Sequence, residues 1–479
     1  MPHDVDLLSV SAATLPALSE RVASPTYDRS SLRRSIVHFG VGGFHRAHLA
    51  TYVDEIANGG NRDWAIVGAG VMASDARMAD VLNSQDHLYT LVSRGAEESE
   101  VAIIGSIVDF VLAVDDATPL IDRIADPDTQ IVSMTITEGG YPVDDNSGEF
   151  APARSLPTGA FAIIVRGLEQ RRSNGGGPMT VMSCDNIMTN GHVARTAMLG
   201  EAARLSRELV EWIEANVRFP NSMVDRITPA TTPGDGEWLE QTYGITDAWP
   251  VVAEPFRQWV VEDDFGGDRL PLESLDVIIT DDIDPYEMTK LRLLNAGHSC
   301  LAYLAALDGF DRVDEAMADP VLRDFVTRLL HLEAKPTLPA AAGIDLDDYI
   351  ASLIERFSNP GVGDQISRLC LDGTAKFPKF LLPTVRAQVA GDGNIARSAL
   401  ALAAWCEYLA TSEHPSPDPQ LDLAIKFAEA SQDDPRAFLA FEEVFGADLA
   451  TSPDFANAFE ARLTAIRRDG VQSAVLAVS

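Results

Sequence analysis

The sequence predicts an α/β protein: a parallel β-sheet covered by helices over residues 1–284, followed by a mostly α-helical domain over residues 285–479. In the first part, short runs rich in Ile and Val alternate with helical patterns, which is typical of a parallel sheet covered on both faces. From Pro285 onward, apolar residues recur at helical spacing and β-rich runs almost disappear. We therefore expect a domain boundary near residue 284.

The expected sheet begins with a β-rich run at 35–39, which stops in glycine and is followed by an amphipathic stretch over 47–56. A second run, 64–68, also stops in glycine. Further strand-like runs continue the series at 88–92, 101–108, 130–137 and 179–184. Helical patterns lie between several of them, at 120–125, 161–171 and 193–217. This order of elements is the basis for predicting parallel strands joined by helices.

The second domain is predicted from segments that carry helical periodicity and end at proline or glycine. These segments span 290–307, 321–332, 347–357, 396–409, 435–445 and 454–468. Because they are separated by short breaks, we expect them to pack on one another as a helical domain.

The composition excludes several classes of protein. The 479 residues include 72 Asp and Glu against 37 Lys and Arg, which gives a formal charge of −35, and 46% of them are hydrophobic. The apolar fraction is too high for intrinsic disorder. The negative charge argues against binding to nucleic acid or anionic membranes, because phosphate contacts need a basic face. The apolar runs are too short to span a membrane.

The expected compartment follows from the N-terminus and the cysteines. Residues 1–21 lack the basic start and apolar stretch of a secretory signal. The four cysteines lie far apart, without zinc-finger or redox spacing, and are expected to be buried thiols in a reducing compartment. We therefore expect a cytoplasmic protein. The large charge suits a soluble monomer, and a dimer is the alternative.

A glycine turn follows the first predicted strand and opens a predicted helix. Its sequence is Gly40-Val-Gly42-Gly43-Phe-His45. This context predicts a Rossmann-like dinucleotide site, which needs a tight turn, a close approach of the backbone to pyrophosphate and a helix N-terminus aimed at the phosphates. His45 stands where the usual third glycine would be. The alternative is an ordinary strand-to-helix turn that needs positive φ.

An acid that binds the adenosine ribose is expected after the second strand. The nearest acids are Asp63, before this strand, and Asp75, after it. Asp75 would favour the 2′-hydroxyl of NAD over the 2′-phosphate of NADP, although Arg77 nearby weakens this inference. As an alternative, Asp75 is a helix N-cap for residues from Ala76 onward.

A second group of polar residues lies on the helix that starts at Asp284. With Lys290 at 0° and about 100° per residue, Glu287 lies at about 60°, His298 at about 80° and Asn295 at about 140°. A desolvated lysine can act as general base on an alcohol, an amide can donate to a developing oxyanion, and a histidine can orient the hydroxyl. The alternative is an internal polar network, with Glu287 closing a capping box.

Several longer stretches are unusual enough to be specific in combination. They are Phe39-Gly-Val-Gly-Gly-Phe-His-Arg-Ala-His48, Thr135-Ile-Thr-Glu-Gly-Gly-Tyr141, Val181-Met-Ser-Cys-Asp-Asn186, Phe219-Pro-Asn-Ser-Met-Val-Asp-Arg-Ile-Thr-Pro229, Lys290-x4-Asn295-x2-His298, Arg368 and Lys376-Phe-Pro-Lys-Phe380. With these stretches, the chain resembles the polyol-specific long-chain dehydrogenases from about residue 30 to the C-terminus.

The resemblance implies an NAD-dependent, metal-independent enzyme that transfers hydride between a polyol carbon and nicotinamide. It assigns the acid/base to Lys290, the oxyanion hole to Asn186 and Asn295, and substrate positioning to His298. Glu138 matches a glutamate that is thought to assist proton movement. In such an enzyme the lysine does, without a metal, what zinc does in zinc alcohol dehydrogenases.

The remaining site residues are also implied by the resemblance. Those expected to contact NAD are Gly40, Val41, Gly42, Gly43, Phe44, Arg46 and Asp75. Asp225, Arg368 and Lys376 match residues that contact the polyol. Each has a simpler alternative: Asp225 and Arg226 as a surface ion pair, and Lys376 and Lys379 as a solvated helix face.

Some positions depart from the family pattern or bear on metal binding. Some members have a glutamate where Ser74 precedes Asp75, which leaves the preference for NAD over NADP less sharply predicted. The Ala-Gly pair at 296–297 stands where Gly-Ser is common, and is expected to affect helix packing more than chemistry. His45 and His48 have no Cys or carboxylate at ligand spacing, so no zinc site is expected.

The expected reaction is the interconversion of D-mannitol and D-fructose. Within the family, D-arabinitol 4-dehydrogenase and fructuronate reductase activities are the alternatives. Fructuronate carries a carboxylate, and Arg368 and Lys376 are candidates for the cation that it would need. Outside the family, the alternatives are a catalytically silent nucleotide-binding sensor and a methyltransferase on the same scaffold, neither of which needs the Lys-Asn-His helix.

Overall fold

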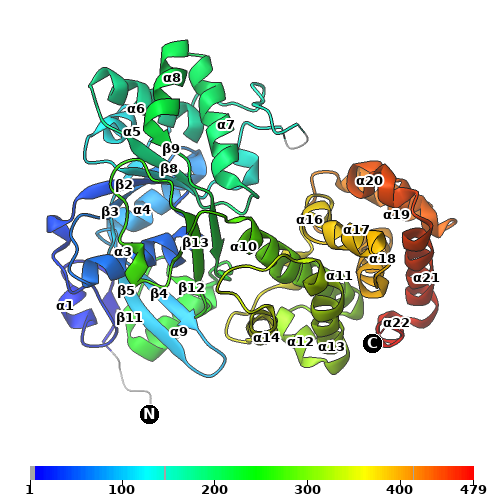
Figure 1. Cartoon of the computed structure of the whole chain (residues 1–479). Coiled ribbons are helices and arrows are strands. Elements are labelled where there is room, and N and C mark those ends of the chain that lie inside the picture. The colour runs from blue at the N-terminus through cyan, green and yellow to red at the C-terminus, as the bar shows by residue number, and fades with distance from the viewer. Residues whose placement is uncertain (1–5, 145–146, 414, 479) are drawn as a thin grey trace. The chain divides into compact units, whose positions relative to one another are not determined.

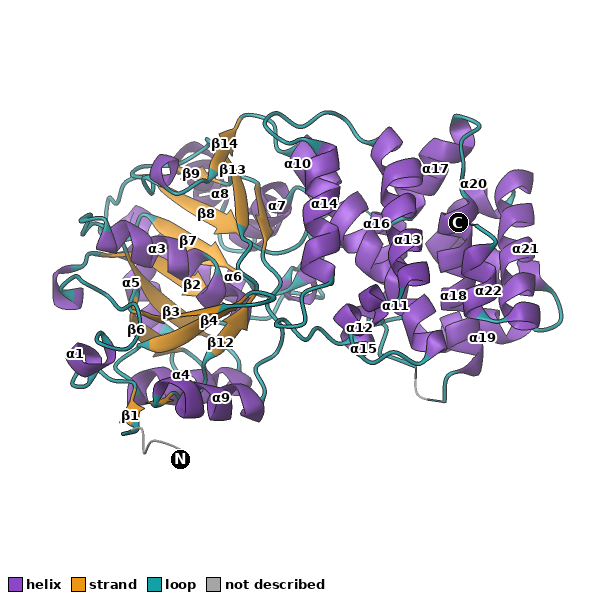
Figure 2. Cartoon of the chain, turned by 90° about the horizontal axis from the view of Figure 1, so that it is seen from below, coloured by secondary structure: helices purple, strands orange, loops and turns teal. Residues whose placement is uncertain are grey.

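The computed structural model describes residues 6–144, 147–413 and 415–478. The chain divides into two compact units, Met1–Ile283 and Asp284–Ser479. In Figure 1 the first unit runs in colour from blue to green and the second from green to red. Figure 2 shows strands and helices in the first unit and helices in the second, so the predicted combination of a Rossmann-like α/β fold with a mostly helical part is confirmed.

The centre of the first unit is a six-stranded sheet in the order β6-β3-β2-β7-β8-β9, in which every pairing is parallel. Its strands are β2 (Arg34–Phe39), β3 (Ala65–Gly70), β6 (Ile107–Leu112), β7 (Ile131–Met134), β8 (Met179–Ser183) and β9 (Val217–Arg218). The chain starts at β2, moves outward through β3 to β6, and then returns to the other side of β2 at β7. This reversal makes the sheet doubly wound, and ligands bind such sheets at the carboxyl ends of the strands beside the reversal.

Helices cover both faces of this sheet. Its strands are apolar at consecutive positions because neighbouring side chains enter different cores. Ile36 packs with α3 and α4 on one face, whereas Val37 packs with α5 to α8 on the other. The helices of the first unit are α1 (Leu15–Leu18), α2 (Gly43–Ala47), α3 (Leu49–Asn58), α4 (Ala76–Ser84), α5 (Thr118–Ala125), α6 (Ala160–Ser173), α7 (Asn190–Ala203), α8 (Arg207–Asn216) and α9 (Pro233–Tyr243).

Two of the expected parallel strands lie outside the main sheet. β4 (Tyr89–Arg94) and β5 (Ser99–Ile104) form an antiparallel pair, and β4 also pairs with β12 (Val251–Ala253). The expected run 101–108 is broken at Gly105 and Ser106, so that only its end belongs to β6. The remaining short strands are β1 (Leu8–Ser9) with β11 (Ile245–Thr246), and β10 (Ser222–Asp225) with β13 (Gln258–Glu262) and β14 (Ile278–Thr280).

The second unit is built of helices throughout its described part. Its elements are α10 (Asp284–Thr289), η5 (Lys290–Asn295), α11 (Ala296–Asp308), α12 (Val313–Ala318), α13 (Pro320–Leu329), η6 (Leu330–Ala334), η7 (Lys335–Thr337), α14 (Leu346–Phe357), α15 (Ile366–Leu369), α16 (Gly373–Phe380), α17 (Leu382–Ala390), α18 (Ala396–Thr411), α19 (Leu421–Ala430), η8 (Pro435–Ala440), α20 (Glu442–Ala450), α21 (Pro453–Asp469) and α22 (Val471–Leu476). The expected helix 435–445 is a 3₁₀ helix followed by the start of α20.

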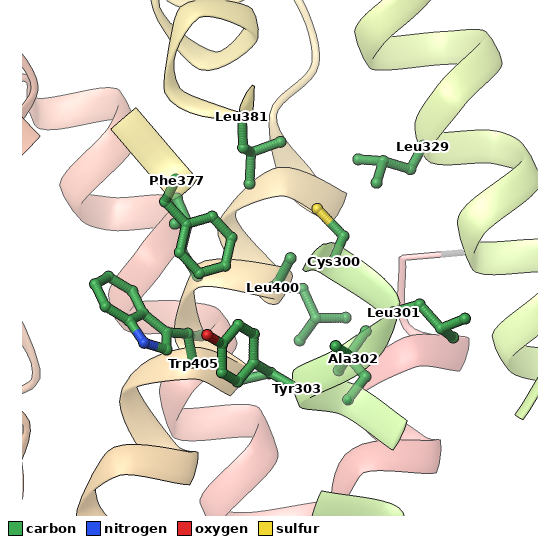
Figure 3. Packing of buried hydrophobic residues seen from close by; sticks show 14 of the residues in the cluster. Cys300, Leu301, Ala302, Tyr303, Leu329, Phe377, Leu381, Leu400 and Trp405 are labelled. Carbon is green, nitrogen blue, oxygen red and sulfur yellow. The ribbon is translucent and has the colours of Figure 1, made fainter. Parts of the chain in front are cut away.

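Helices α11 and α18 are the centre of the second unit. They pack on each other, and α18 also packs on α21. Residues from both helices join a large apolar cluster in which Tyr303 of α11, Phe377 of α16 and Trp405 of α18 lie together (Figure 3). Because α11 is buried along most of its length, its position is fixed by packing. Within the residues that the structure describes, no helix is long and apolar enough to cross a membrane.

Candidate active site

In the first unit, the predicted motifs meet at one edge of the main sheet. The glycine turn follows β2, Asp75 follows β3, Glu138 follows β7 and Asn186 follows β8. Because these strands are parallel, their carboxyl ends share one edge, which we call the carboxyl edge. β2 and β7 are neighbours at the point where the strand order reverses, which is the position of a dinucleotide site in this type of sheet.

The glycine turn has the geometry that a pyrophosphate needs. Gly40 has φ +84°, and a Cβ there would lie 2.1 Å from the carbonyl oxygen of Thr135. The Thr135 hydroxyl also donates to the Gly40 carbonyl at 2.8 Å, which ties the turn after β2 to the loop after β7. Gly42 is the N-cap of α2, so the turn leads directly into a helix N-terminus. The turn therefore fits a dinucleotide, and Gly40 can only be glycine.

His45 fills the place of the third glycine. It is buried, and its ring stacks on the ring of His38 with centroids 3.4 Å apart. Burial lowers the pKa of His38 to about 3 and holds the pKa of His45 well below its ordinary value, so both rings are neutral. His38 contacts the hydroxyls of Ser133 and Thr135. These histidines therefore pack α2 against β2, as the third glycine does in other dinucleotide turns.

The described residues contain no group of three or more His, Cys, Asp or Glu side chains that could hold a metal ion.

His48, the third histidine of this region, is buried, with Nε2 3.1 Å from the carbonyl oxygen of Gln258. Burial lowers its pKa to about 3. The ring stacks on Phe44, one of the residues predicted to contact the cofactor. Val41, another of them, is also buried.

Arg46 is buried inside the first unit. Its guanidinium donates to the Trp249 carbonyl at 2.6 Å and lies over the rings of Tyr89 and Trp249. Arg77, the residue expected to weaken the preference for NAD, lies over the same Trp249 ring at 4.0 Å. The structure thus gives Arg46 a packing role under the glycine turn, and its contact with the cofactor stays a prediction.

Asp75 holds the loop after β3. Although it stands at the N-cap position of α4, its side chain turns back to the preceding loop, where Oδ2 accepts hydrogen bonds from the amides of Val71 and Met72, both at 2.9 Å. The carboxylate is therefore fixed at the carboxyl edge, beside the end of β3. This is the position that a ribose-binding acid occupies in a dinucleotide-binding sheet.

Asp185 is a residue that the sequence analysis did not single out. It is buried, and it accepts hydrogen bonds from the amides of Ile136 at 3.1 Å and Thr137 at 2.8 Å and from the Tyr141 hydroxyl at 2.7 Å. Thr137 has φ 63° and ψ 164°, a sparsely populated conformation for a residue with a side chain. Burial raises the pKa of Asp185 to about 6, against the effect of these hydrogen bonds.

Asp185 therefore connects the loops that carry two predicted catalytic residues. Glu138 follows the strained Thr137 and is exposed, whereas Asn186 follows Asp185 directly. The hydrogen bonds that the Asp185 carboxylate accepts therefore fix the backbone before Glu138 and, at the same time, the start of the loop that carries Asn186. The only signal in the sequence is that Asp185 belongs to the long motif ending at Asn186, because a positive φ at Thr137 has no signature in residue type.

Asp225 and Arg226 are both buried, so the alternative of a surface ion pair is wrong. Asp225 is the last residue of β10. The Arg226 guanidinium donates to the carbonyls of Glu254 at 2.9 Å and Ala47 at 2.5 Å. Arg226 therefore joins β10 to the segment that follows the glycine turn, and it keeps Asp225 at the end of its strand.

In the second unit, the Lys-Asn-His segment contains a π-helical turn. η5 covers Lys290–Asn295 and lies between two α-helical stretches. The predicted angle of about 140° between Lys290 and Asn295 assumed α-helical geometry. A π-helix bonds residue i to i+5 and has more residues per turn than an α-helix, so residues five apart are separated by a smaller angle than the α-helical value of about 140°. The wide turn therefore brings Asn295 onto the side of Lys290, with His298 one further α-helical turn along.

The side chains of this segment are enclosed. Lys290 and His298 are each 8% exposed and Glu287 is 4% exposed, while Asn295 is more accessible. The His298 ring stacks on Phe357 of α14 with centroids 3.9 Å apart. A Cβ at Gly297 would lie 3.2 Å from the Phe357 ring, so glycine at this position serves packing, as expected.

Arg368 and Lys376 lie on short helices that pack against this segment. α15 contacts α11, and α16 contacts both α11 and η5. Arg368 forms two hydrogen bonds to the buried Asp364, and Lys376 Nζ donates to the Leu369 carbonyl at 3.2 Å. Lys379 is exposed, whereas Lys376 is partly buried, so only Lys379 fits the alternative of a solvated helix face.

The start of α16 is fixed by a close approach. A Cβ at Gly373 would lie 2.6 Å from the Tyr303 hydroxyl and 2.7 Å from Trp405 Nε1, two side chains of the cluster in Figure 3. The Thr374 amide donates to Asp418 at 2.7 Å. Glycine and this cap therefore set where Lys376, three residues further on, is presented.

The chain matches two family models that together cover most of its length. They are the mannitol dehydrogenase Rossmann domain, over residues 34–274, and the mannitol dehydrogenase C-terminal domain, over residues 282–467. With the doubly wound sheet and the Lys-Asn-His helix, these matches define an oxidoreductase that acts on CH–OH groups. The chain belongs to the mannitol dehydrogenase family.

Individual proteins give the same result. Mannitol 2-dehydrogenase from Aspergillus fumigatus is 41% identical over 473 residues, which is 94% of this chain and 94% of that protein. The structure of Pseudomonas fluorescens mannitol 2-dehydrogenase in ternary complex with NAD and D-mannitol is 42% identical, covers 98% of this chain and 99% of its own, and has a TM-score of 0.90. A D-sorbitol dehydrogenase structure in substrate-free form is 36% identical over 97% of this chain and all of its own, with a TM-score of 0.88.

Proposed function

We propose that this chain is an NAD-dependent polyol dehydrogenase that interconverts D-mannitol and D-fructose, with Lys290 as general acid and base. The observation that carries the proposal is the π-helical turn, which gathers Lys290, Asn295 and His298 on one side of a buried helix. The relatives and the solved neighbour named as mannitol 2-dehydrogenases support the choice of substrate.

The reaction assigns a proton role to Lys290. Lys290 is 8% exposed, and in this role its side chain accepts the proton of the substrate hydroxyl during oxidation and returns it during ketose reduction. Asn295, together with Asn186, donates to the oxygen as negative charge develops on it. The His298 ring, held against Phe357, orients the reacting hydroxyl. NAD, when bound, supplies the hydride acceptor.

The cofactor is assigned to the glycine turn and to Asp75. The turn offers a close backbone approach and a helix N-terminus for the pyrophosphate. The Asp75 carboxylate, fixed by the amides of Val71 and Met72, suits a ribose 2′-hydroxyl and repels a 2′-phosphate. The preference for NAD over NADP follows from this charge. Asp225, Arg368 and Lys376 are assigned to the polyol.

Two carboxyl groups are candidates for passing the proton between Lys290 and solvent. Glu138 is exposed in the loop after β7. Glu287 is buried and lies one helical turn before Lys290 on the same helix. A relay must stay close to the base throughout the reaction, and the position of Glu287 on the same rigid element favours it.

The test is NADH oxidation with D-fructose, D-xylulose and D-fructuronate, on the wild type and on Lys290→Ala. We expect the wild type to reduce D-fructose with the highest kcat/KM and the variant to lose about 10³-fold in kcat, the range of a removed acid–base catalyst. The variant should still bind NADH, measured by nicotinamide fluorescence. No turnover of any ketose would refute the dehydrogenase and favour the nucleotide sensor. A higher kcat/KM for D-xylulose would instead assign the chain to D-arabinitol.

A further inference from the structure

The inference concerns an ion pair in the predicted substrate segment. The Arg368 guanidinium donates from Nε to Asp364 Oδ1 at 2.7 Å and from Nη2 to Asp364 Oδ2 at 2.5 Å. The carboxylate side chain is 5% exposed and the guanidinium 45% exposed. The pair is therefore bidentate, with its negative partner enclosed and its positive partner open to a ligand.

Asp364 keeps its charge in this position. Burial alone would raise its pKa, but the hydrogen bonds and charge of Arg368, with a smaller contribution from His298, hold the pKa below its ordinary value. The carboxylate is thus ionised at neutral pH and cancels the charge of Arg368.

The pairing changes what Arg368 can bind. A guanidinium has five N–H donors, of which Asp364 takes two and leaves three. These three can donate to the hydroxyls of a polyol or a neutral ketose. A substrate carboxylate at the same place would be attracted by Arg368 but also repelled by Asp364, so the pairing weakens the net attraction.

We infer that Asp364 determines the substrate class of the site: by neutralising Arg368, it makes the site select uncharged polyols and ketoses and discriminate against uronic acids. The inference rests on the proposed function and names the residue behind its preference for a neutral sugar. The inference concerns only the charge presented at Arg368.

The test compares kcat/KM for D-fructuronate and D-fructose, with NADH, in the wild type and in Asp364→Asn. Asparagine keeps an oxygen acceptor for Arg368 but removes the negative charge. We expect the ratio of the two kcat/KM values to rise by about tenfold or more in favour of the uronate. The gain should shrink as the salt concentration increases from about 0.05 to about 0.5 M, because the Debye length falls from above about 10 Å to below about 8 Å over this range.

The matched control is Asp324→Asn. Asp324 and Arg328 form the same Asp–Arg pair at the same i,i+4 spacing, on the exposed side of α13. This variant should leave the ratio within about twofold of the wild type, since exposed pairs contribute little. A second substitution, Arg368→Gln, removes the cation. An Asp364 that stays ionised would then repel the uronate, and one that takes up a proton would leave the site neutral, so the ratio should fall or stay level.

The outcomes separate the inference from the function on which it rests. An unchanged ratio in Asp364→Asn, in a variant whose circular dichroism matches the wild type, would overturn the inference. If Asp364→Asn does not fold, Arg368→Gln decides, and a ratio that rises in that variant would overturn the inference as well. A wild type that prefers D-fructuronate would refute the role of Asp364 but keep the dehydrogenase. A wild type that reduces no ketose would refute both.

Discussion

The two units position their functional residues by different means. In the first unit, the candidate residues lie on loops at the carboxyl edge, and acidic side chains hold those loops by accepting hydrogen bonds from backbone amides, as Asp75 and Asp185 do. In the second unit, Lys290, Asn295 and His298 lie on one helix, where the helical turn and side-chain packing set their places. A loop needs a partner for its backbone, whereas a helix satisfies its own. Disturbing the first unit should therefore act through backbone contacts, and disturbing the second through side-chain chemistry.

The largest effect is expected at Lys290. Lys290→Arg keeps the positive charge but places a guanidinium that stays protonated at neutral pH, so it cannot act as a base. We expect kcat for D-mannitol oxidation to fall by about 10³-fold, nearly as far as in Lys290→Ala. Steady-state kinetics from pH 6 to 10 provide the measurement. Activity in the arginine variant within about tenfold of the wild type would show that charge, and not proton transfer, is what this helix supplies.

The next effect is expected at Gly40, where the backbone of the first unit is most constrained. Gly40→Ala must adopt a positive φ and place Cβ against the Thr135 carbonyl. We expect a loss of about 2–4 kcal/mol in the free energy of unfolding and more than about tenfold in NADH affinity. Urea unfolding and fluorescence titration measure the two. Gly236→Ala is the control, because the space around its Cβ is open and it lies within helix α9. Equal behaviour of the two variants would contradict the strained turn.

A smaller effect is expected at Asp185, and Asp54 offers a matched comparison. Both are buried carboxylates that accept bonds from a tyrosine hydroxyl and from a backbone amide, Tyr27 and Gly105 in the case of Asp54. We expect Asp185→Asn to lower kcat/KM by about 10- to 100-fold, because the charged acceptor that ties the loop after β7 to the loop of Asn186 is lost. Asp54→Asn should leave kcat/KM near that of the wild type. A loss of activity in both variants would point to general destabilisation.

The last effect leaves activity aside and concerns the pH dependence of stability. Burial raises the pKa of Asp54 from 3.8 to about 6, so its ionisation costs the folded state free energy. Its contribution to stability is present below about pH 4 and is lost as the pH rises through about 6. Relative to Asp54→Asn, the wild type should lose about 2 kcal/mol between pH 4 and 7, measured by urea unfolding at each pH. If the difference in unfolding free energy between the two proteins stayed constant with pH, Asp54 would have the same pKa in the folded and unfolded states.

The comparison between the units also separates what the sequence could predict from what it could not. The parallel sheet and the glycine turn follow from local patterns: an Ile/Val run that ends in Gly40 predicts both the strand and its turn. The displacement of β4 and β5 could not be predicted, because Gly105, which breaks the run between β5 and β6, donates to Asp54, a residue far away in the chain. Pairing of this kind depends on tertiary contacts.

The site shows the same division. The residues of the Lys-Asn-His helix were evident from their types and spacing, but their angular arrangement was wrong in detail, because the periodicity argument assumed α-helical bonding at every position. The roles of Asp185 and Asp364 were also out of reach. Each role depends on which amides or guanidinium the fold brings to the carboxylate. The sequence does not distinguish an acid that binds such a partner from an acid in solvent.

The π-helical turn at Lys290–Asn295 has a consequence for how this segment can change. The wide turn is equivalent to one residue inserted into an α-helix. Removing a single residue from Leu291 to Leu294 would restore α-helical bonding and rotate everything from Asn295 onward by about 100° relative to Lys290. The three leucines of this stretch are buried and would turn away from their core. The length of the segment is thus under tighter constraint than the identity of most residues in it, and natural variation here should take the form of substitutions, not of insertions or deletions.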